Sequence, residues 1–130
     1  MAYPTGSGSE RLMRGTIDSV SNTEACLLFD GNNNTGINQT TNAVPANHII
    51  TVLSIIICEM GGASELIRMY VTCPSPTSSI FLLRDQPIGA NATFVWNEKI
   101  VLQGGDKLAV YLNSAGNCDV NYSYIDQDWS

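Results

Sequence analysis

Large apolar residues fall on every second position in the strand-like segments of the last third of the chain, and this period of two is what most constrains the fold. The alternation runs through residues 99–102, 107–112 and 118–125. Because successive side chains of a β-strand point to opposite faces, each segment is expected to form a strand with one apolar face. The joints at 103–106 and 113–117 contain glycine, which allows the positive φ that tight hairpins require. The pattern predicts a β-meander.

The rest of the chain also has the pattern of an all-β protein. Further strands are expected at about residues 12–19, 25–30, 48–59, 65–73, 79–83 and 93–96. Turn signals recur every 8–12 residues or so, roughly the spacing found in sandwiches, jelly rolls and barrels, and no helical periodicity persists for a useful length. We therefore predict a single antiparallel β-sandwich or jelly-roll-like domain of about eight strands.

Two local connections follow from the turn residues. Gly61 and Gly62 are expected to turn the strand at 48–59 back onto the strand at 65–73, which gives a central hairpin. Residues 84–91, which include a proline and a glycine, are predicted to connect two strands.

Composition supports one domain that folds without metals or disulfides. The 130 residues are 44% apolar and 14% charged, and a chain of this length can bury a sizeable core. The formal net charge is −6, and acidic residues outnumber basic ones two to one, so we expect no nucleic-acid partner. The most apolar stretch, residues 49–58, falls well short of the roughly 20 residues of a membrane-spanning helix. We therefore expect a buried strand there and no membrane partner.

The first residues differ in composition from the rest. Residues 1–11 are rich in Gly, Ser and Thr and poor in apolar residues, which predicts a flexible N-terminal arm followed by a β-sandwich domain over residues 12–130. Such an arm is either disordered or held by a neighbouring molecule. The segment also lacks the basic start and apolar stretch of a secretory signal, which indicates a protein made in a cytosol.

The usual ingredients of catalysis and metal binding are missing from the sequence. His48 is the single histidine, and no nucleophile elbow or Gly-rich phosphate loop is present. We interpret His48 as an ordinary residue at the start of a strand. Asp126 and Asp128 are interpreted as a solvated tail rather than a calcium site, which would need six or more oxygens around a turn glycine. The chain is therefore not expected to be an enzyme or to hold a cofactor or a metal.

Four cysteines, Cys26, Cys58, Cys73 and Cys118, are spaced far apart. We interpret them as small buried hydrophobic residues in a reducing compartment. Two disulfides are the alternative, and Cys58 and Cys73 would be neighbours if their strands pair, although pairing alone does not give the geometry of a disulfide.

Three segments, taken together, resemble a known family. They are residues 87–94 (Pro-Ile-Gly-Ala-Asn-Ala-Thr-Phe), 100–110 (Ile-Val-Leu-x-Gly-Gly-Asp-x-Leu-x-Val) and 120–126 (Val-x-Tyr-Ser-Tyr-Ile-Asp). Their order is similar to that of a β-sandwich module in small virion proteins of tailed bacteriophages. The resemblance covers roughly residues 80–126, and its Gly-Asp turns are by themselves common in proteins.

The resemblance implies a structural role in a virion. It points to a capsid decoration, or cement, protein that is made in the host cytoplasm and then binds the surface of the assembled head. The implied partners are the major capsid protein and further copies of the chain, as a homotrimer. The arm and the residues after it, with Tyr3, Arg11 and Arg14, form the candidate strap over neighbouring subunits. Trp129, a large apolar residue close to the end of the chain, is the other candidate contact.

Other functions stay open at this point. A tail, neck or fibre component of the same virion would use similar strands. A carbohydrate-binding β-sandwich would need exposed aromatic residues such as Trp96, Tyr111 or Trp129 to line a groove. An enzyme is the third reading. For the strap, deletion of residues 1–14 is expected to abolish capsid association while the domain stays folded.

Overall fold

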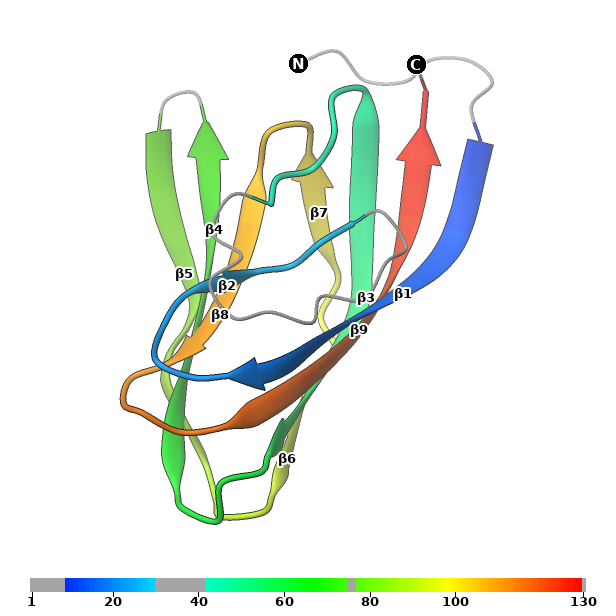
Figure 1. Cartoon of the computed structure of the whole chain (residues 1–130). Coiled ribbons are helices and arrows are strands. Elements are labelled where there is room, and N and C mark those ends of the chain that lie inside the picture. The colour runs from blue at the N-terminus through cyan, green and yellow to red at the C-terminus, as the bar shows by residue number, and fades with distance from the viewer. Residues whose placement is uncertain (1–8, 30–41, 75–76, 130) are drawn as a thin grey trace.

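In the part of the chain that the structure describes, nine β-strands are arranged in two layers (Figure 1). The computed structural model describes residues 9–29, 42–74 and 77–129. The strands are β1 (Ser9–Val20), β2 (Ala25–Cys26), β3 (His48–Glu59), β4 (Glu65–Pro74), β5 (Thr77–Ile88), β6 (Thr93–Trp96), β7 (Ile100–Gln103), β8 (Lys107–Leu112) and β9 (Cys118–Asp128). No helix occurs in the described ranges, and so none there could cross a membrane. The all-β prediction is confirmed.

The two sheets are antiparallel throughout. Sheet A has the order β1-β9-β3, and the far edge of β3 pairs with both β6 and β7. Residues 55–58 of β3 pair with β6 and residues 49–52 with β7, so these two short strands form one interrupted edge strand. Sheet B has the order β2-β8-β4-β5. With β6 and β7 taken together, eight strands are divided equally between two sheets, which is the double-sheet arrangement of a jelly roll.

The predicted meander and the predicted central hairpin are both wrong. β7 and β9 lie in sheet A while β8, between them in sequence, lies in sheet B. β3 and β4 also lie in different sheets, and the β4–β5 hairpin is the one place in the described chain where successive strands pair. Alternation identifies a face that must be buried, but it does not identify the neighbouring strand. Here the glycine-containing joints carry the chain between the layers, because each apolar face needs a second layer to cover it.

Several strand boundaries also differ from the prediction. Residues 84–88, predicted as a connection, belong to β5, where Asp85 has a φ of 59° and the register with β4 shifts at two places. Pro87 fits there because β5 is an edge strand, whose outer N–H groups need no partner. The expected strand at 25–30 is reduced to the two residues of β2, and Asp30 lies outside the described residues.

The start of the first strand also differs from the prediction, because β1 begins inside the segment predicted as an arm. Residues 9–11 pair with residues 126–128 of β9, so the sandwich starts three residues earlier than expected. The remaining part of the arm, residues 1–8, lies outside the described residues.

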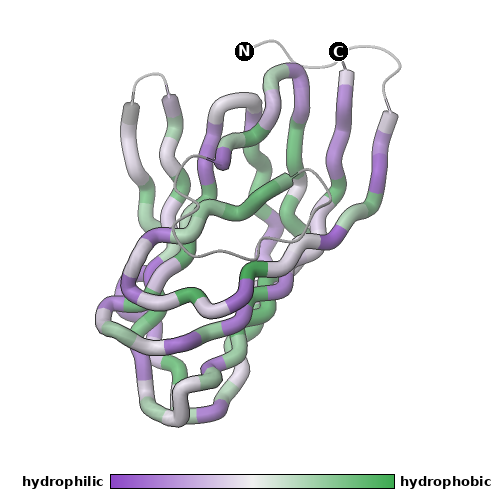
Figure 2. Tube along the Cα trace, viewed as in Figure 1, coloured by the Kyte–Doolittle hydropathy of each residue, from purple (hydrophilic) through white to green (hydrophobic). Residues whose placement is uncertain are grey.

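The core lies between the two sheets. Figure 2 shows hydrophobic and hydrophilic residues alternating along several strands, which is the pattern that places one face of each strand inside. The largest fully buried side chains are Tyr122, Tyr124, Ile17, Leu27, Ile50, Ile55, Ile57, Ile67, Met69, Leu102, Leu108 and Leu112. The rings of Tyr122 and Tyr124 both pack edge-on against Phe29, with centroids 5.8 and 5.0 Å away.

A buried carboxylate connects two turns at the lower end of the sandwich in Figure 1. Glu59, the last residue of β3, is 1% exposed and accepts hydrogen bonds from the backbone N–H groups of Asn91, Gly61 and Gly62, at 2.8, 2.7 and 2.9 Å. These N–H groups, led by that of Asn91, lower the pKa of Glu59. The contact joins the turn after β3 to the turn before β6.

Candidate interaction surface

The outer face of sheet A, opposite the core, carries a row of side chains across its whole width. Leu12 of β1 lies opposite Ile125 of β9, Ile125 opposite Thr51 of β3, and Thr51 opposite Val101 of β7. The two ends of the row are the most exposed: Leu12 is 75% and Val101 61% exposed. Three of these four residues are apolar, so the row is an apolar stripe on a surface that faces solvent.

A second row crosses the same face nearer to the lower end of the sandwich. Thr16 lies opposite Asn121, Asn121 opposite Ile56, and Ile56 opposite Val95, with Ile56 and Val95 both exposed. Beside this row is a shallow hollow of about 300 Å³. Its lining residues are Thr16, Ile17, Asp18, Ile56, Cys58, Asp119, Val120 and Asn121. The hollow is open, and its walls come from β1, β3 and β9.

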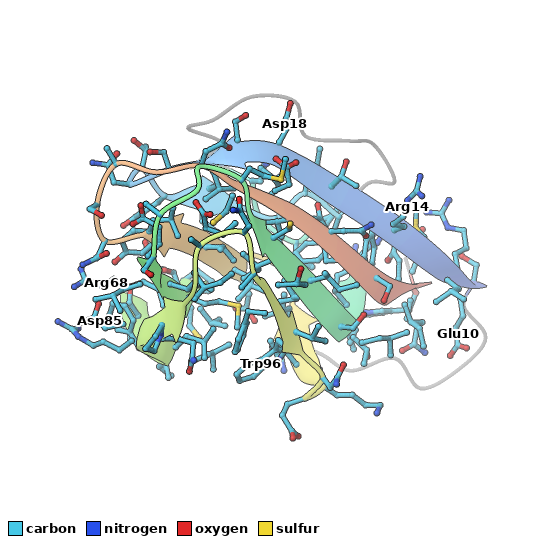
Figure 3. The ribbon with its side chains drawn as sticks, turned by 90° about the horizontal axis from the view of Figure 1, so that it is seen from below. Glu10, Arg14, Asp18, Arg68, Asp85 and Trp96 are labelled. Carbon is cyan, nitrogen blue, oxygen red and sulfur yellow. The ribbon has the colours of Figure 1, made fainter. Side chains whose placement is uncertain are left out.

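Charged side chains follow one margin of this face. Glu10, Arg14 and Asp18 are exposed and are spaced four residues apart along β1 (Figure 3). Four residues are two full pleats of a strand, so all three belong to the same face as Leu12. Between the two rows, Ser54 and Ser123 are joined by a hydrogen bond of 2.9 Å between their hydroxyls. The outer face of sheet A is therefore apolar toward β7 and charged toward β1.

An ionic cluster forms around one buried carboxylate at the upper end of sheet A, with residues from β1, β3 and β9. Asp126 is 1% exposed; its carboxylate lies 2.7 Å from His48 Nδ1 and 3.4 Å from Arg11 Nη2. Nε2 of His48 lies 3.6 Å from Asp128. The prediction that Asp126 and Asp128 form a solvated tail is wrong, because β9 continues to Asp128 and its alternation turns Asp126 inward. No group of three or more His, Cys, Asp or Glu in the described ranges is placed to hold a metal ion.

Trp129 lies at the same end and is partly buried by the domain itself. Its backbone N–H donates to the carbonyl of Asn47, at 3.1 Å. Its indole Nε1 is buried, without a hydrogen-bond partner among the described residues. Most of the Trp129 surface is thus removed from solvent within the described chain.

The outer face of sheet B has a different character, because aromatic and charged side chains gather there. Tyr70 lies 5.3 Å from Phe81 and 6.1 Å from Tyr111 between ring centroids. Burial raises the pKa of Tyr70. Arg68 Nε donates to Asp85 at 2.6 Å, and this hydrogen bond lowers the pKa of Asp85 (Figure 3).

Cys26, Cys58, Cys73 and Cys118, all in the described ranges, form no disulfide there. Cys58 and Cys73 belong to strands in different sheets, so the strand pairing that would have made them neighbours does not occur. Burial raises the pKa of Cys118 to about 12 and also raises that of Cys26.

The residues proposed from the sequence as an interface are not brought together. Tyr3 lies outside the described residues. Arg11 and Arg14 are on opposite faces of β1, with Arg11 bound to the buried Asp126 and Arg14 on the outer face. Trp129 packs at the upper end.

The exposed apolar residues Leu12, Ile56, Val95 and Val101 were not predicted from the sequence as surface residues. A usable signal was that residues 49–58 are apolar on both alternating sets of positions. Such a strand is expected to be covered on both faces, yet sheet A is covered by sheet B on one face only. Apolar residues on its other face are therefore exposed in the single chain.

No protein-family model and no curated protein sequence matches this chain. Solved structures do resemble it. A chain of infectious bursal disease virus Gx strain is 11% identical with a TM-score of 0.50, over 100% of this chain and 36% of the viral chain. This chain therefore spans about a third of the length of the viral one.

Two further structures are similar over nearly their whole length. The globular domain of zebrafish complement 1qA protein is 12% identical with a TM-score of 0.44, over 88% of this chain and 94% of that domain. The CBM22-1 xylan-binding domain of Paenibacillus barcinonensis Xyn10C is 9% identical with a TM-score of 0.44, over 97% and 98%. At these identities, similarity concerns the fold; the viral chain supports the β-sandwich architecture.

Proposed function

We propose that this chain is a structural protein of a virion and that it binds other protein through the outer face of sheet A. The observation that carries the proposal is the set of four large apolar side chains exposed on that face, Leu12, Ile56, Val95 and Val101. A monomeric protein rarely exposes a large contiguous apolar patch, and such patches mark interaction sites. Covering these residues with a second protein would remove their apolar surface from water.

The virion role is supported by the resemblance, over roughly residues 80–126, to small virion proteins of tailed bacteriophages. The fold is compatible with it, since a chain of infectious bursal disease virus has a similar architecture. Within this role, the capsid decoration protein is our first choice. It would be made in the host cytoplasm, bind the major capsid protein on the outside of the assembled head, and use many copies to gain avidity.

Substitutions in β6 and β7, at the edge of sheet A opposite to β1, test the docking surface. Val95→Glu together with Val101→Glu places two charges among the exposed apolar residues of β6 and β7. Capsid binding is expected to weaken at least about tenfold, because a buried unpaired charge opposes association. The matched control is Ile80→Glu, at a 56% exposed position of β5 in sheet B. Equal binding by both variants would contradict the assignment of the face.

A test of the candidate strap requires a shorter deletion than that of residues 1–14. Removal of residues 1–14 would delete half of β1, whose residues 9–14 pair with β9. Removal of residues 1–8 keeps the pairing intact. If the arm holds the capsid, this shorter chain stays folded and loses capsid binding, whereas unchanged binding would leave the face of sheet A as the docking element.

A tail, neck or fibre component is the alternative within the same class, and it would be present in few copies per particle.

Carbohydrate binding is favoured by one observation, the cluster of Tyr70, Phe81 and Tyr111 on the outer face of sheet B. The rings meet at 44° and 88° rather than forming one flat platform. A glycan array with the intact chain and with Tyr111→Ala tests it, because a sugar site there would lose its ligand in the variant.

A further inference from the structure

We propose that two copies of this chain pair through their β1 strands and so extend sheet A across a two-fold axis. Among the strands that the structure describes, β1 is the terminal strand of sheet A and pairs with β9 along one side. The opposite edge of a terminal strand presents backbone N–H and C=O groups that a further strand can bind. An identical strand can do so in antiparallel orientation about a two-fold axis.

Among the edges of the two sheets, β1 has the features most suitable for such pairing. β5 contains register shifts and Pro87, which disfavour a further strand. The β6–β7 edge is interrupted at residues 97–99, and β2 has two residues. β1, in contrast, is 12 residues long, and residues 9–17 pair with β9 without a register shift. Natural proteins commonly protect their edges as the other three are protected here.

The side chains of β1 specify the register. When the axis passes through Leu12, this residue faces Leu12 of the second copy, and Glu10 faces Arg14 of the second copy on each side of it. Two opposite-charge pairs then flank an apolar contact. Cross-strand pairs of these kinds stabilise antiparallel sheets. Leu12 is also the most exposed of the large apolar residues, at 75%.

Other registers fit less well. An axis through Arg14 would oppose two arginines and would place Glu10 against Asp18, so that like charges meet along the pair. An axis through Thr16 would bring the irregular part of β1 into the contact, where the register shifts after Ile17 and Ser19 has a φ of 61°.

The register at Leu12 also joins the apolar rows of both copies. In each copy the row runs from Leu12 through Ile125 and Thr51 to Val101. Pairing places the two rows end to end, so that one stripe crosses the whole extended sheet. This inference rests on β1 and does not depend on the virion role. Its two-fold symmetry differs from the trimer that the resemblance implies.

A charge-swap experiment on the full chain tests the pairing. Sedimentation equilibrium is expected to give a dimer for the natural sequence. Glu10→Arg or Arg14→Glu alone is expected to weaken the dimer at least about tenfold, because opposite-charge pairs become like-charge pairs. The double variant Glu10→Arg/Arg14→Glu restores opposite charges and is expected to restore the dimer. Asp18→Arg is the control, since Asp18 lies on β1 outside the paired segment.

Crosslinking checks the register separately. Residues opposite one another in antiparallel strands have Cα atoms about 4.5 or 5.5 Å apart, within the roughly 4.4–6.8 Å range of disulfides. Under oxidation, Leu12→Cys is expected to give a covalent dimer that Val101→Cys, also strongly exposed, does not give. The proposal is overturned if the natural chain is a monomer or a trimer, if the single charge reversals leave the dimer unchanged, or if the double variant does not recover it.

Discussion

Glu59 connects segments that are 32 residues apart in sequence, and its charge is part of the connection. Because its pKa is lower in the folded chain than the value of about 4.3 for an unfolded glutamate, its stabilising effect is present above that pH. The effect is lost as the pH falls through the folded pKa. We expect Glu59→Gln to melt at a lower temperature than the natural chain near neutral pH, and the difference to shrink on acidification.

Thermal unfolding followed by circular dichroism across the acidic range measures this difference. Glu98→Gln is the control, because Glu98 is exposed and its side chain is in none of these contacts. A difference between Glu59→Gln and the natural chain that stays constant down to low pH would show that the charge of Glu59 does not stabilise the turns.

Residue 15 must be a glycine because the ring of Tyr122 lies against its backbone. A Cβ at this position would overlap the Tyr122 ring, with Cε2 at 2.6 Å, and Tyr122 is 1% exposed. The Tyr122 hydroxyl donates to the carbonyl of Leu28 at 2.5 Å and accepts from its N–H at 2.9 Å. Gly15→Ala is expected to cost about 2–3 kcal/mol in urea unfolding through overpacking and strained hydrogen bonds. Thr16→Val, on the outer face, is expected to change stability by less than about 1 kcal/mol.

At the scale of the strands, the sequence predicts positions better than partners. The limits of β3 and β6 match the strands predicted at 48–59 and 93–96. Pairing depends on contacts between distant segments: β1 and β9, at the two ends of the described chain, are neighbours in sheet A. A short-range pattern of polar and apolar residues contains no information about such a neighbour, which is why hairpins were expected where the chain crosses between sheets.

The candidate surface was predicted less well than the fold, for a related reason. Arg11 and Arg14 were both placed in the candidate strap, but an odd sequence separation places them on opposite faces of β1. Arg11 and His48 share one buried partner, Asp126, which lies far from both of them in the sequence. The outer face of sheet A can be identified only when it is known that sheet B covers the inner face.

β3 offers a direct test of which face is inside, because two identical residues stand side by side. Ile57 is 1% exposed and lies in the core, whereas Ile56 is 41% exposed on the outer face. Ile57→Ala is expected to destabilise the chain by about 2–5 kcal/mol, and Ile56→Ala by less than about 1 kcal/mol. Urea unfolding measures both. Equal losses in the two variants would contradict the assignment of the core face of sheet A.

At the scale of the whole molecule, one layer of the sandwich faces the core and also offers an apolar outer surface. Sheet B covers the inner side of sheet A, while Leu12, Ile56, Val95 and Val101 remain exposed on the other side. The pairing of β1 strands and the docking of the outer face use different groups, namely backbone edges and side-chain faces. Both can therefore occur in one assembly, with a paired unit lying flat on a protein shell.

The most direct test of the proposed virion role is quantitative mass spectrometry of purified particles of the proposed virus, which measures the number of copies of this chain per particle. A decoration protein bound to repeated sites on the shell predicts hundreds of copies, in proportion to the major capsid protein. A dozen copies or fewer would move the chain to the neck or tail. Its absence from purified particles would contradict the virion role.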